Sequence, residues 1–221
     1  MERFLSLAKG IRTNNLSMNH ETFPGTALII IDIINTLAFP EGGSLLDQAL
    51  PIAKNIVDLK RQSRQIGIPV VYVNDNFGKW HSDWKSVYGL CSADESLGAP
   101  LAKLLEPFEE DYFVLKPRHS GFYNTCLDVL LGELQVHNLI LTGIAGNICV
   151  LFTAHEAHMR KYNLWIPSNC TASNTPQENE GAMLHLNQTL QIAIDDFNQN
   201  DKELSSTLRR VFKEAQHPSQ L

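Results

Sequence analysis

The sequence predicts an α/β protein, namely a single-domain, Rossmann-like, three-layer α/β/α fold. Short apolar runs alternate with helix-like stretches along the 221 residues, and this alternation is typical of a parallel sheet with helices on both faces. The first run, residues 27–32, is unbroken and rich in isoleucine, as expected for a strand that is covered on both faces. Neither an internal repeat nor a linker divides the chain, which is long enough to bury a full core.

Each strand is predicted from an apolar run bounded by turn residues, at 27–32, 69–74, 112–116, 138–142 and 163–167. A short sixth strand is expected where isoleucines alternate with other residues, at 192–195. Helices are expected between these strands, at 52–65, 101–105, 124–133, 149–162 and 176–190. The polar and aromatic stretch 75–98 is expected to be an insertion above the sheet. The domain is therefore placed at 26–198, between an N-terminal extension (1–25) and a C-terminal polar helix or tail (199–221).

Composition excludes several classes of function. The net charge is −6 and no dense cluster of Lys and Arg occurs, so nucleic acid is not an expected partner. No apolar run reaches the roughly 18 residues that cross a bilayer, and the first 25 residues lack the apolar core of a signal peptide. The four cysteines form no CxxC pair, which favours a reducing cytoplasm over a disulfide framework.

Chemically useful side chains interrupt the ends of four predicted strands. Asp32 ends the first strand, Asn74 the second and Lys116 the third, while Cys149 follows the fourth. The carboxyl ends of parallel strands meet at one edge of the sheet, where ligands bind. An acid, an amine and a thiol are therefore expected to lie close together at this edge.

Cys149 is expected at the start of a helix, after a glycine-containing turn. Backbone N–H groups and the helix dipole at that position favour the thiolate, although a buried, inert cysteine is the alternative from this local pattern alone. Asp32 is suited to accept the thiol proton as a general base. The positive charge of Lys116 is expected to lower the pKa of both groups. Together the three predict a nucleophilic cysteine that attacks an acyl carbon, with N–H groups of the preceding turn facing the oxyanion.

Four sequence blocks resemble the isochorismatase-like cysteine hydrolase superfamily, which includes nicotinamidases, N-carbamoylsarcosine amidohydrolase, ureidoacrylate hydrolases and isochorismatases. The blocks are 28–35 (LIIIDIIN), 69–74 (PVVYVN), 116–125 (KPRHSGFYNT) and 143–154 (GIAGNICVLFTA). The resemblance covers about residues 26–196. It implies a Cys149–Asp32–Lys116 triad and a six-stranded parallel sheet of order 3-2-1-4-5-6. It also implies a cis peptide bond at Ile144–Ala145 and an oxyanion hole formed by the N–H groups of Ala145 and Cys149.

The same resemblance implies a substrate class. Some members hold a metal through an Asp-x-His pattern with further histidines after the second strand, whereas only His81 occurs here, so neither a metal nor another cofactor is expected. A thiol nucleophile favours a small amide or ureide, whose C–N bond is cleaved through a thioester. The alternatives are an isochorismatase-type hydrolase of a vinyl ether and a non-catalytic binding or scaffold protein on the same fold. A homodimer or homotetramer is implied.

The substrate pocket is expected at the same edge of the sheet. Aromatic side chains on loops have few core positions to fill, so they are candidates for its walls; packing against a neighbouring subunit is the alternative. The candidate pocket residues are Asn35, Phe39, Asn74, Phe77, Trp80, Trp84 and Phe122.

Overall fold

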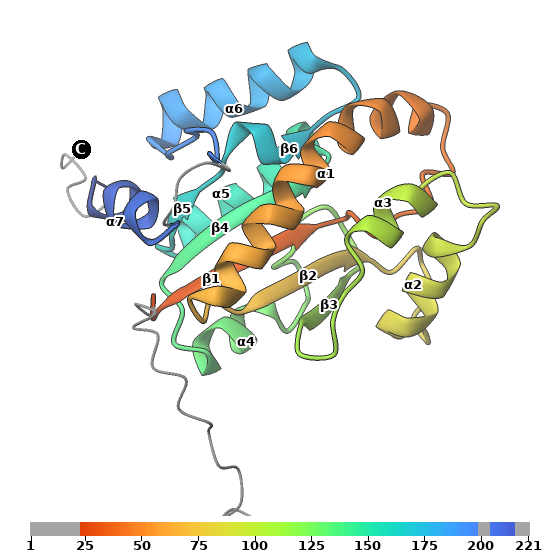
Figure 1. Cartoon of the computed structure of the whole chain (residues 1–221), viewed down its shortest axis with the longest axis horizontal. Helices are drawn as coiled ribbons and strands as arrows, with labels where there is room; N and C mark the ends of the chain where they lie inside the picture. The colour runs from red at the N-terminus through yellow and green to blue at the C-terminus, as the bar shows by residue number, and fades with distance from the viewer. Residues whose placement is uncertain (1–22, 199–203, 215–221) are drawn as a thin grey trace, which may run out of the picture.

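The computed structural model describes residues 23–198 and 204–214 and confirms the predicted fold class. A parallel sheet, ordered β3-β2-β1-β4-β5 with β6 beside β4, lies between two layers of helices (Figure 1). The strands are β1 Thr26–Ile31, β2 Val70–Asp75, β3 Tyr112–Lys116, β4 Asn138–Ile144, β5 Asn163–Trp165 and β6 Thr171–Ala172. The longer helices are α1 Gly42–Gln65, α2 Trp84–Ser92, α5 Leu151–Met159, α6 Pro176–Leu190 and α7 Leu204–Glu214. The shorter ones are α3 Ala99–Leu104, α4 Leu127–Glu133, a π-helical turn Gly146–Val150 and a 3₁₀ turn Ser168–Cys170.

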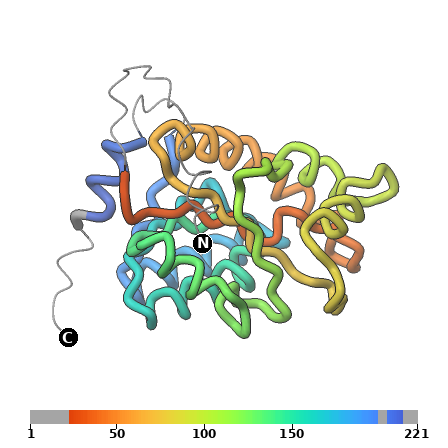
Figure 2. The backbone as a smooth tube through the Cα atoms, turned by 90° about the horizontal axis from the view of Figure 1, so that it is seen from below, coloured from red at the N-terminus to blue at the C-terminus, as the bar shows by residue number. Residues whose placement is uncertain are grey.

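Alternation of side chains along the buried strands builds two hydrophobic cores. Leu28 and Ile30 of β1 face a cluster that contains residues of α1, α2, α3 and α7, whereas Ile29 and Ile31 face residues of α4, α5 and α6. The two helix layers are separated in the view along the sheet in Figure 2, with α1 above and α4 below. Because β1 is completely buried, its carboxyl end has a fixed position at the centre of the sheet edge.

The sixth strand lies beside β4, whereas the expected order placed it beside the fifth strand. β6 pairs with the carboxyl-terminal half of β4, through Gly143 with Thr171 and Ile144 with Ala172, while β5 pairs with the other half of β4. The segment expected as a strand at 192–195 forms a single bridge, between Ala193 and Trp165. A three-residue β5 leaves the end of β4 unpaired, and β6 supplies the missing partner there.

Helix α1 begins ten residues earlier than the sequence predicts, at Gly42 instead of Ile52. The proline at position 51 was expected to lie before the helix, but it lies within it. Proline removes one N–H and leaves the carbonyl four residues earlier, at Asp47, without its helical partner. Both residues are exposed, so water can satisfy that carbonyl.

The stretch 75–98 contains a helix that the sequence analysis missed. Asp83 caps α2, and its carboxylate accepts a hydrogen bond from the Ser86 N–H at 2.9 Å. Val87 and Cys91 of α2 are buried in the first core. The available signal was an N-cap residue, Asp83, directly before apolar residues at helical spacing, Trp84, Val87 and Cys91.

The described part of the C-terminal region forms one helix, α7. Of the predicted extension 1–25, residues 1–22 lie outside the described residues, as do 199–203 and 215–221 of the predicted tail. The described part of the tail is α7, whose buried side chains join the first core: Leu204, Leu208, Val211 and Phe212. Figure 1 shows α7 beside the β5 edge of the sheet. In the described part of the chain, no helix is long and apolar enough to cross a membrane.

A buried ion cluster joins α1 to the start of β3. Lys60 Nζ lies 2.8 Å from Asp111 Oδ2 and donates hydrogen bonds to the Tyr72 hydroxyl and the Glu106 carbonyl. Arg64 bonds the other oxygen of Asp111 at 2.9 Å. Burial lowers the pKa of Lys60, and its bond to Asp111 opposes that shift. The carboxylate therefore balances two cations on α1 at a site with little access to water.

Asp111→Ala should reduce the free energy of unfolding by about 3–5 kcal/mol, because it leaves the buried Lys60 ammonium without its counter-ion. Asp94→Ala is the control, since Asp94 also forms a short ion pair, with Lys103, but is exposed. Its loss should cost under about 1 kcal/mol. Urea denaturation of the three proteins measures both values. Equal losses in the two variants would contradict the assignment.

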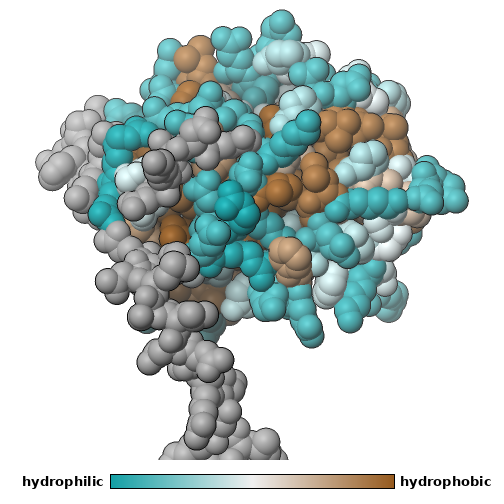
Figure 3. All heavy atoms as spheres, viewed as in Figure 1, coloured by the Kyte–Doolittle hydropathy of each residue, from teal (hydrophilic) through white to brown (hydrophobic). Residues whose placement is uncertain are grey.

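The surface is not uniformly polar. Figure 3 shows hydrophobic side chains gathered over the side of the molecule that carries α2 and α3. Exposed apolar residues of these helices and their connection include Leu90, Leu97 and Leu104. Phe39, a predicted pocket residue, is 40% exposed and borders a hollow that it shares with Leu90 and Leu97.

Candidate active site

The carboxyl ends of β1, β3 and β4 converge on one cluster of polar side chains. Asp32 directly follows β1 and has a positive φ of 51°, while Lys116 is the last residue of β3. The close approach of β4 to the end of β1 depends on Gly143. Its φ is +112°, and an added Cβ would lie 2.0 Å from the Ile31 carbonyl oxygen. Glycine at this position therefore lets the turn that carries Cys149 approach Asp32.

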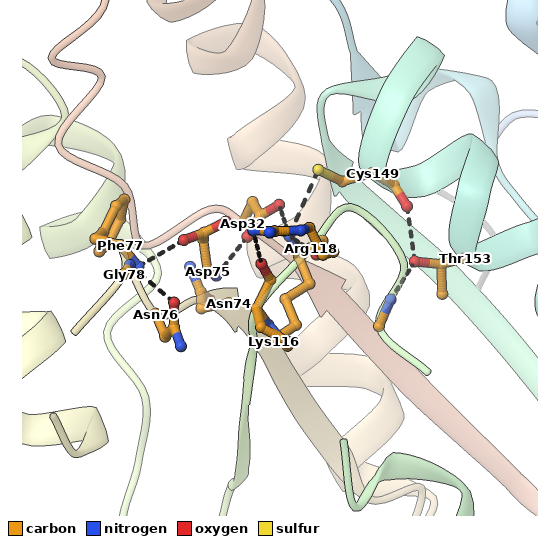
Figure 4. A network of polar contacts seen from close by, with 12 residues as sticks. Asp32, Asn74, Asp75, Asn76, Phe77, Gly78, Lys116, Arg118, Cys149 and Thr153 are labelled. Atoms are coloured by element: carbon orange, nitrogen blue, oxygen red, sulfur yellow. Dashed lines mark hydrogen bonds and ion pairs between the residues drawn. The ribbon is translucent and has the colours of Figure 1, made fainter. Parts of the chain in front are cut away.

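Lys116 connects the two other groups (Figure 4). Its Nζ lies 2.8 Å from Asp32 Oδ2 and 3.5 Å from Cys149 Sγ, and it donates to the Arg118 carbonyl at 3.1 Å. Asp32 is also close enough to the Cys149 thiol for each group to influence the pKa of the other. The structure thus brings together the acid, the amine and the thiol from three separate segments, and both charged groups are buried.

The electrostatics of the cluster correct one expectation. Burial raises the pKa of the Cys149 thiol well above its usual range, the negative charge of Asp32 adds to this shift, and the attraction of Lys116 does not cancel it. The prediction of a lowered thiol pKa is therefore wrong. Burial also raises the pKa of Asp32 in spite of Lys116. Burial opposes the charge on Lys116, but Asp32 and Cys149 outweigh it and raise the pKa of the lysine.

The raised pKa of the thiol fits the total charge of the buried cluster. An ionised Asp32 and a protonated Lys116 compensate each other, so a neutral thiol completes a cluster without excess charge among these three groups. Loss of the thiol proton to solvent would add a buried negative charge. Transfer of that proton to Asp32 keeps the total charge unchanged. Burial and the charge of Asp32 therefore disfavour a resting thiolate at Cys149.

Cys149 lies in the π-helical turn that precedes α5, not in the first turn of an α-helix as expected. The Ile144–Ala145 peptide bond is cis. The Ala145 carbonyl accepts hydrogen bonds from the N–H groups of Ile148 and Val150. The oxyanion hole formed by Ala145 and Cys149 stays a prediction.

Hydrogen bonds hold both ends of this turn. Thr153 Oγ1 donates to the Cys149 carbonyl at 2.7 Å and accepts the Gly121 N–H at 2.9 Å. On the other side, the Asn147 N–H donates to Ser173 Oγ at 3.0 Å. Asn179 packs against Gly146, where an added Cβ would lie 2.0 Å from its Oδ1. The nucleophile turn is thereby tied to β6 and α6, a connection that the sequence analysis missed.

The predicted pocket residues have different positions. Asn74 is fully buried and its Nδ2 donates to the Ile34 carbonyl at 2.7 Å, so it holds the segment after β1. Asn35 Oδ1 accepts the Leu37 N–H, within the same segment. Phe122 is 4% exposed and stacks on Tyr162 in the second core.

The three remaining aromatic candidates lie on the segment after β2. Phe77 is half-buried against the first core. Trp84 packs against Phe113 of β3, with ring centroids 6.1 Å apart, whereas Trp80 is 77% exposed. The sequence could not assign these rings to the core, to the pocket wall or to the surface, since an aromatic ring suits all three positions.

Asp75, the last residue of β2, is a member of the cluster that the sequence analysis did not include. Its backbone N–H donates to Asp32 Oδ1 at 2.8 Å, and its Oδ2 lies 3.9 Å from Lys116 Nζ. An aspartate next to Asn74 at the end of a parallel strand was the available signal. Over residues 23–198 and 204–214, no three His, Cys, Asp or Glu side chains are grouped so that they could hold a metal ion.

Comparison with known proteins identifies the class. The family model named Isochorismatase domain matches residues 26–196, and the chain therefore belongs to the isochorismatase family of hydrolases. It is 43% identical, over 164 residues, to the uncharacterized isochorismatase family protein YaaI of Bacillus subtilis, covering 74% of this chain and 90% of YaaI.

Relatives with a named activity are more distant. The ureidoacrylate amidohydrolase RutB of Serratia proteamaculans is 29% identical over 188 residues, which covers 72% of this chain and 75% of RutB. Among solved structures, the nicotinamidase/pyrazinamidase PncA of Bacillus subtilis superimposes with a TM-score of 0.60 at 27% identity, covering 77% of this chain and 99% of PncA. Relatives with a named activity thus include amide hydrolases.

Proposed function

We propose that this protein hydrolyses the C–N bond of a small amide or ureide through a thioester on Cys149. The observation that carries the proposal is the position of Lys116 Nζ, 2.8 Å from Asp32 and 3.5 Å from Cys149 in a buried cluster. The activities named for RutB and PncA support the same substrate class.

In the first half of the reaction, Asp32 accepts the thiol proton while Sγ of Cys149 attacks the carbonyl carbon. The tetrahedral adduct carries an oxyanion, which the N–H groups of Ala145 and Cys149 stabilise. The C–N bond then breaks, and the leaving nitrogen takes the proton from Asp32. Ammonia or an amine departs and the acyl group remains on sulfur.

In the second half, Asp32 removes a proton from water, and the resulting hydroxide attacks the thioester. The C–S bond breaks, and Cys149 regains the proton from Asp32. The acid product leaves with one oxygen from water, so the net reaction consumes one water for each C–N bond. Lys116 stays protonated throughout, and its charge offsets that of whichever partner is anionic.

A screen of primary amides and ureides for ammonia release tests this function. Hydroxylamine added during turnover should divert the thioester to a hydroxamate, which mass spectrometry detects. A vinyl ether belongs in the same screen, because the isochorismatase-type reaction would release its carbonyl product without ammonia. Turnover of the vinyl ether alone, or amide turnover that never yields a hydroxamate, would contradict the proposal.

A further inference from the structure

We propose that Asp75 is a substrate-binding residue, whose Oδ2 accepts a hydrogen bond from the nitrogen of the scissile amide or ureide. The inference rests on the function proposed above and deepens it, since it names the group that distinguishes a C–N substrate from the corresponding ester.

The first argument is the count of donors on Lys116. An ammonium group has three N–H donors, and Nζ has three partners nearer than Asp75. These are Asp32 Oδ2 at 2.8 Å, the Arg118 carbonyl at 3.1 Å and Cys149 Sγ at 3.5 Å. At 3.9 Å, Asp75 Oδ2 feels the charge of the lysine but receives no hydrogen bond from it.

The second argument is the unequal use of the two carboxylate oxygens. Asp75 Oδ1 accepts the Phe77 N–H, which closes a local turn. Within the described residues, no hydrogen bond reaches Oδ2, whereas 37% of the side chain is exposed. A carboxylate oxygen without a donor, next to a buried reactive cluster, is available to a ligand.

The third argument is position. Asp75 and Cys149 flank the Asp32–Lys116 pair in the view of Figure 4. Asp75 Oδ2 and Cys149 Sγ each lie within 3.9 Å of the same Nζ, so one small molecule can reach both. A carbonyl carbon at Sγ carries its nitrogen one bond away, and an N–H on that nitrogen meets an acceptor at Asp75. An ester oxygen has no hydrogen to offer.

Asp75→Asn is the sharpest test, because asparagine keeps an oxygen for the Phe77 turn and leaves the backbone bond to Asp32 intact. It places an N–H₂ group where the free acceptor was. Asp83→Asn makes the same exchange at an exposed residue of the same segment, and asparagine still caps α2. Thermal unfolding of both variants checks that the fold is retained.

The probes are matched pairs of a primary amide and the methyl ester of the same acid, such as butyramide with methyl butyrate and benzamide with methyl benzoate. The ratio of kcat/KM for amide over ester should fall by about tenfold or more in Asp75→Asn and stay within about twofold in Asp83→Asn. The ratio cancels any general loss of catalytic power. If the variant slows amide and ester equally, Asp75 only positions its neighbours and the inference is wrong. If the wild-type protein cleaves no amide or ureide in the screen described above, the proposed function itself fails, and this inference with it.

Discussion

Cys149→Ala should lower kcat on an identified amide or ureide by roughly 10⁴-fold or more, because no thioester can form without the sulfur. Cys149→Ser should be nearly as slow, because a serine hydroxyl is harder to deprotonate than a thiol and therefore transfers its proton to Asp32 less readily. The KM value should change far less than kcat in both variants. Steady-state ammonia release measures all three proteins.

Cys126→Ala is the matched control, since Cys126 is a free cysteine that is exposed at the start of α4. It should retain wild-type turnover. Cys149→Ala that keeps turnover within tenfold of the wild type would show that the thiol is not the nucleophile.

Asp32→Asn should lower turnover and also lower the pKa of the Cys149 thiol, whereas a mechanism with a resting thiolate held by Asp32 predicts lower turnover with a higher thiol pKa. Turnover should fall by roughly 10³-fold or more, because the general base is lost for both halves of the reaction. The pKa of the Cys149 thiol should nevertheless decrease, because Asp32 is one of the groups that raise it while Lys116 lowers it. Removal of the carboxylate leaves the ammonium as the dominant charge beside the sulfur.

Iodoacetamide alkylation followed across pH measures that thiol pKa. The midpoint for Asp32→Asn should lie below that of the wild type, so alkylation near neutral pH becomes faster while hydrolysis becomes slower. Asp58→Asn, at a half-buried position on α1 where Asp58 pairs with Arg61, should leave both profiles unchanged. A variant in which alkylation and turnover fall together would indicate that Asp32 maintains a resting thiolate.

Much of the fold and the central part of the site were readable from the sequence. Unbroken β-branched runs identified the buried strands, and the polar residue at the end of each run marked the edge of the sheet. Because parallel strands end at a common edge, Asp32, Lys116 and Cys149 could be grouped without coordinates. Helix α1 was predicted too short, because its apolar stripe was followed only from Ile52, whereas Leu45 and Ala49 are buried as well.

The direction of the thiol pKa and the roles of the surrounding residues depended on the tertiary structure. Sequence spacing places charges near one another but gives neither their burial nor their hydrogen bonds, and burial is the larger influence on Cys149. Phe122 and Phe77 are chemically alike, yet one is packed in a core and the other is half-buried near the site.

The sequence by itself determined the α/β class, the edge of the sheet that bears the site, and the three residues that meet there. Only the tertiary structure decided that burial raises the pKa of the Cys149 thiol, that Asn74 is fully buried, and that no hydrogen bond from the described residues reaches Asp75 Oδ2 beside the cluster. The physical reason is that the strands and the polar residues at their ends follow from local patterns, whereas desolvation and hydrogen-bond counts are set by every segment that packs around a group.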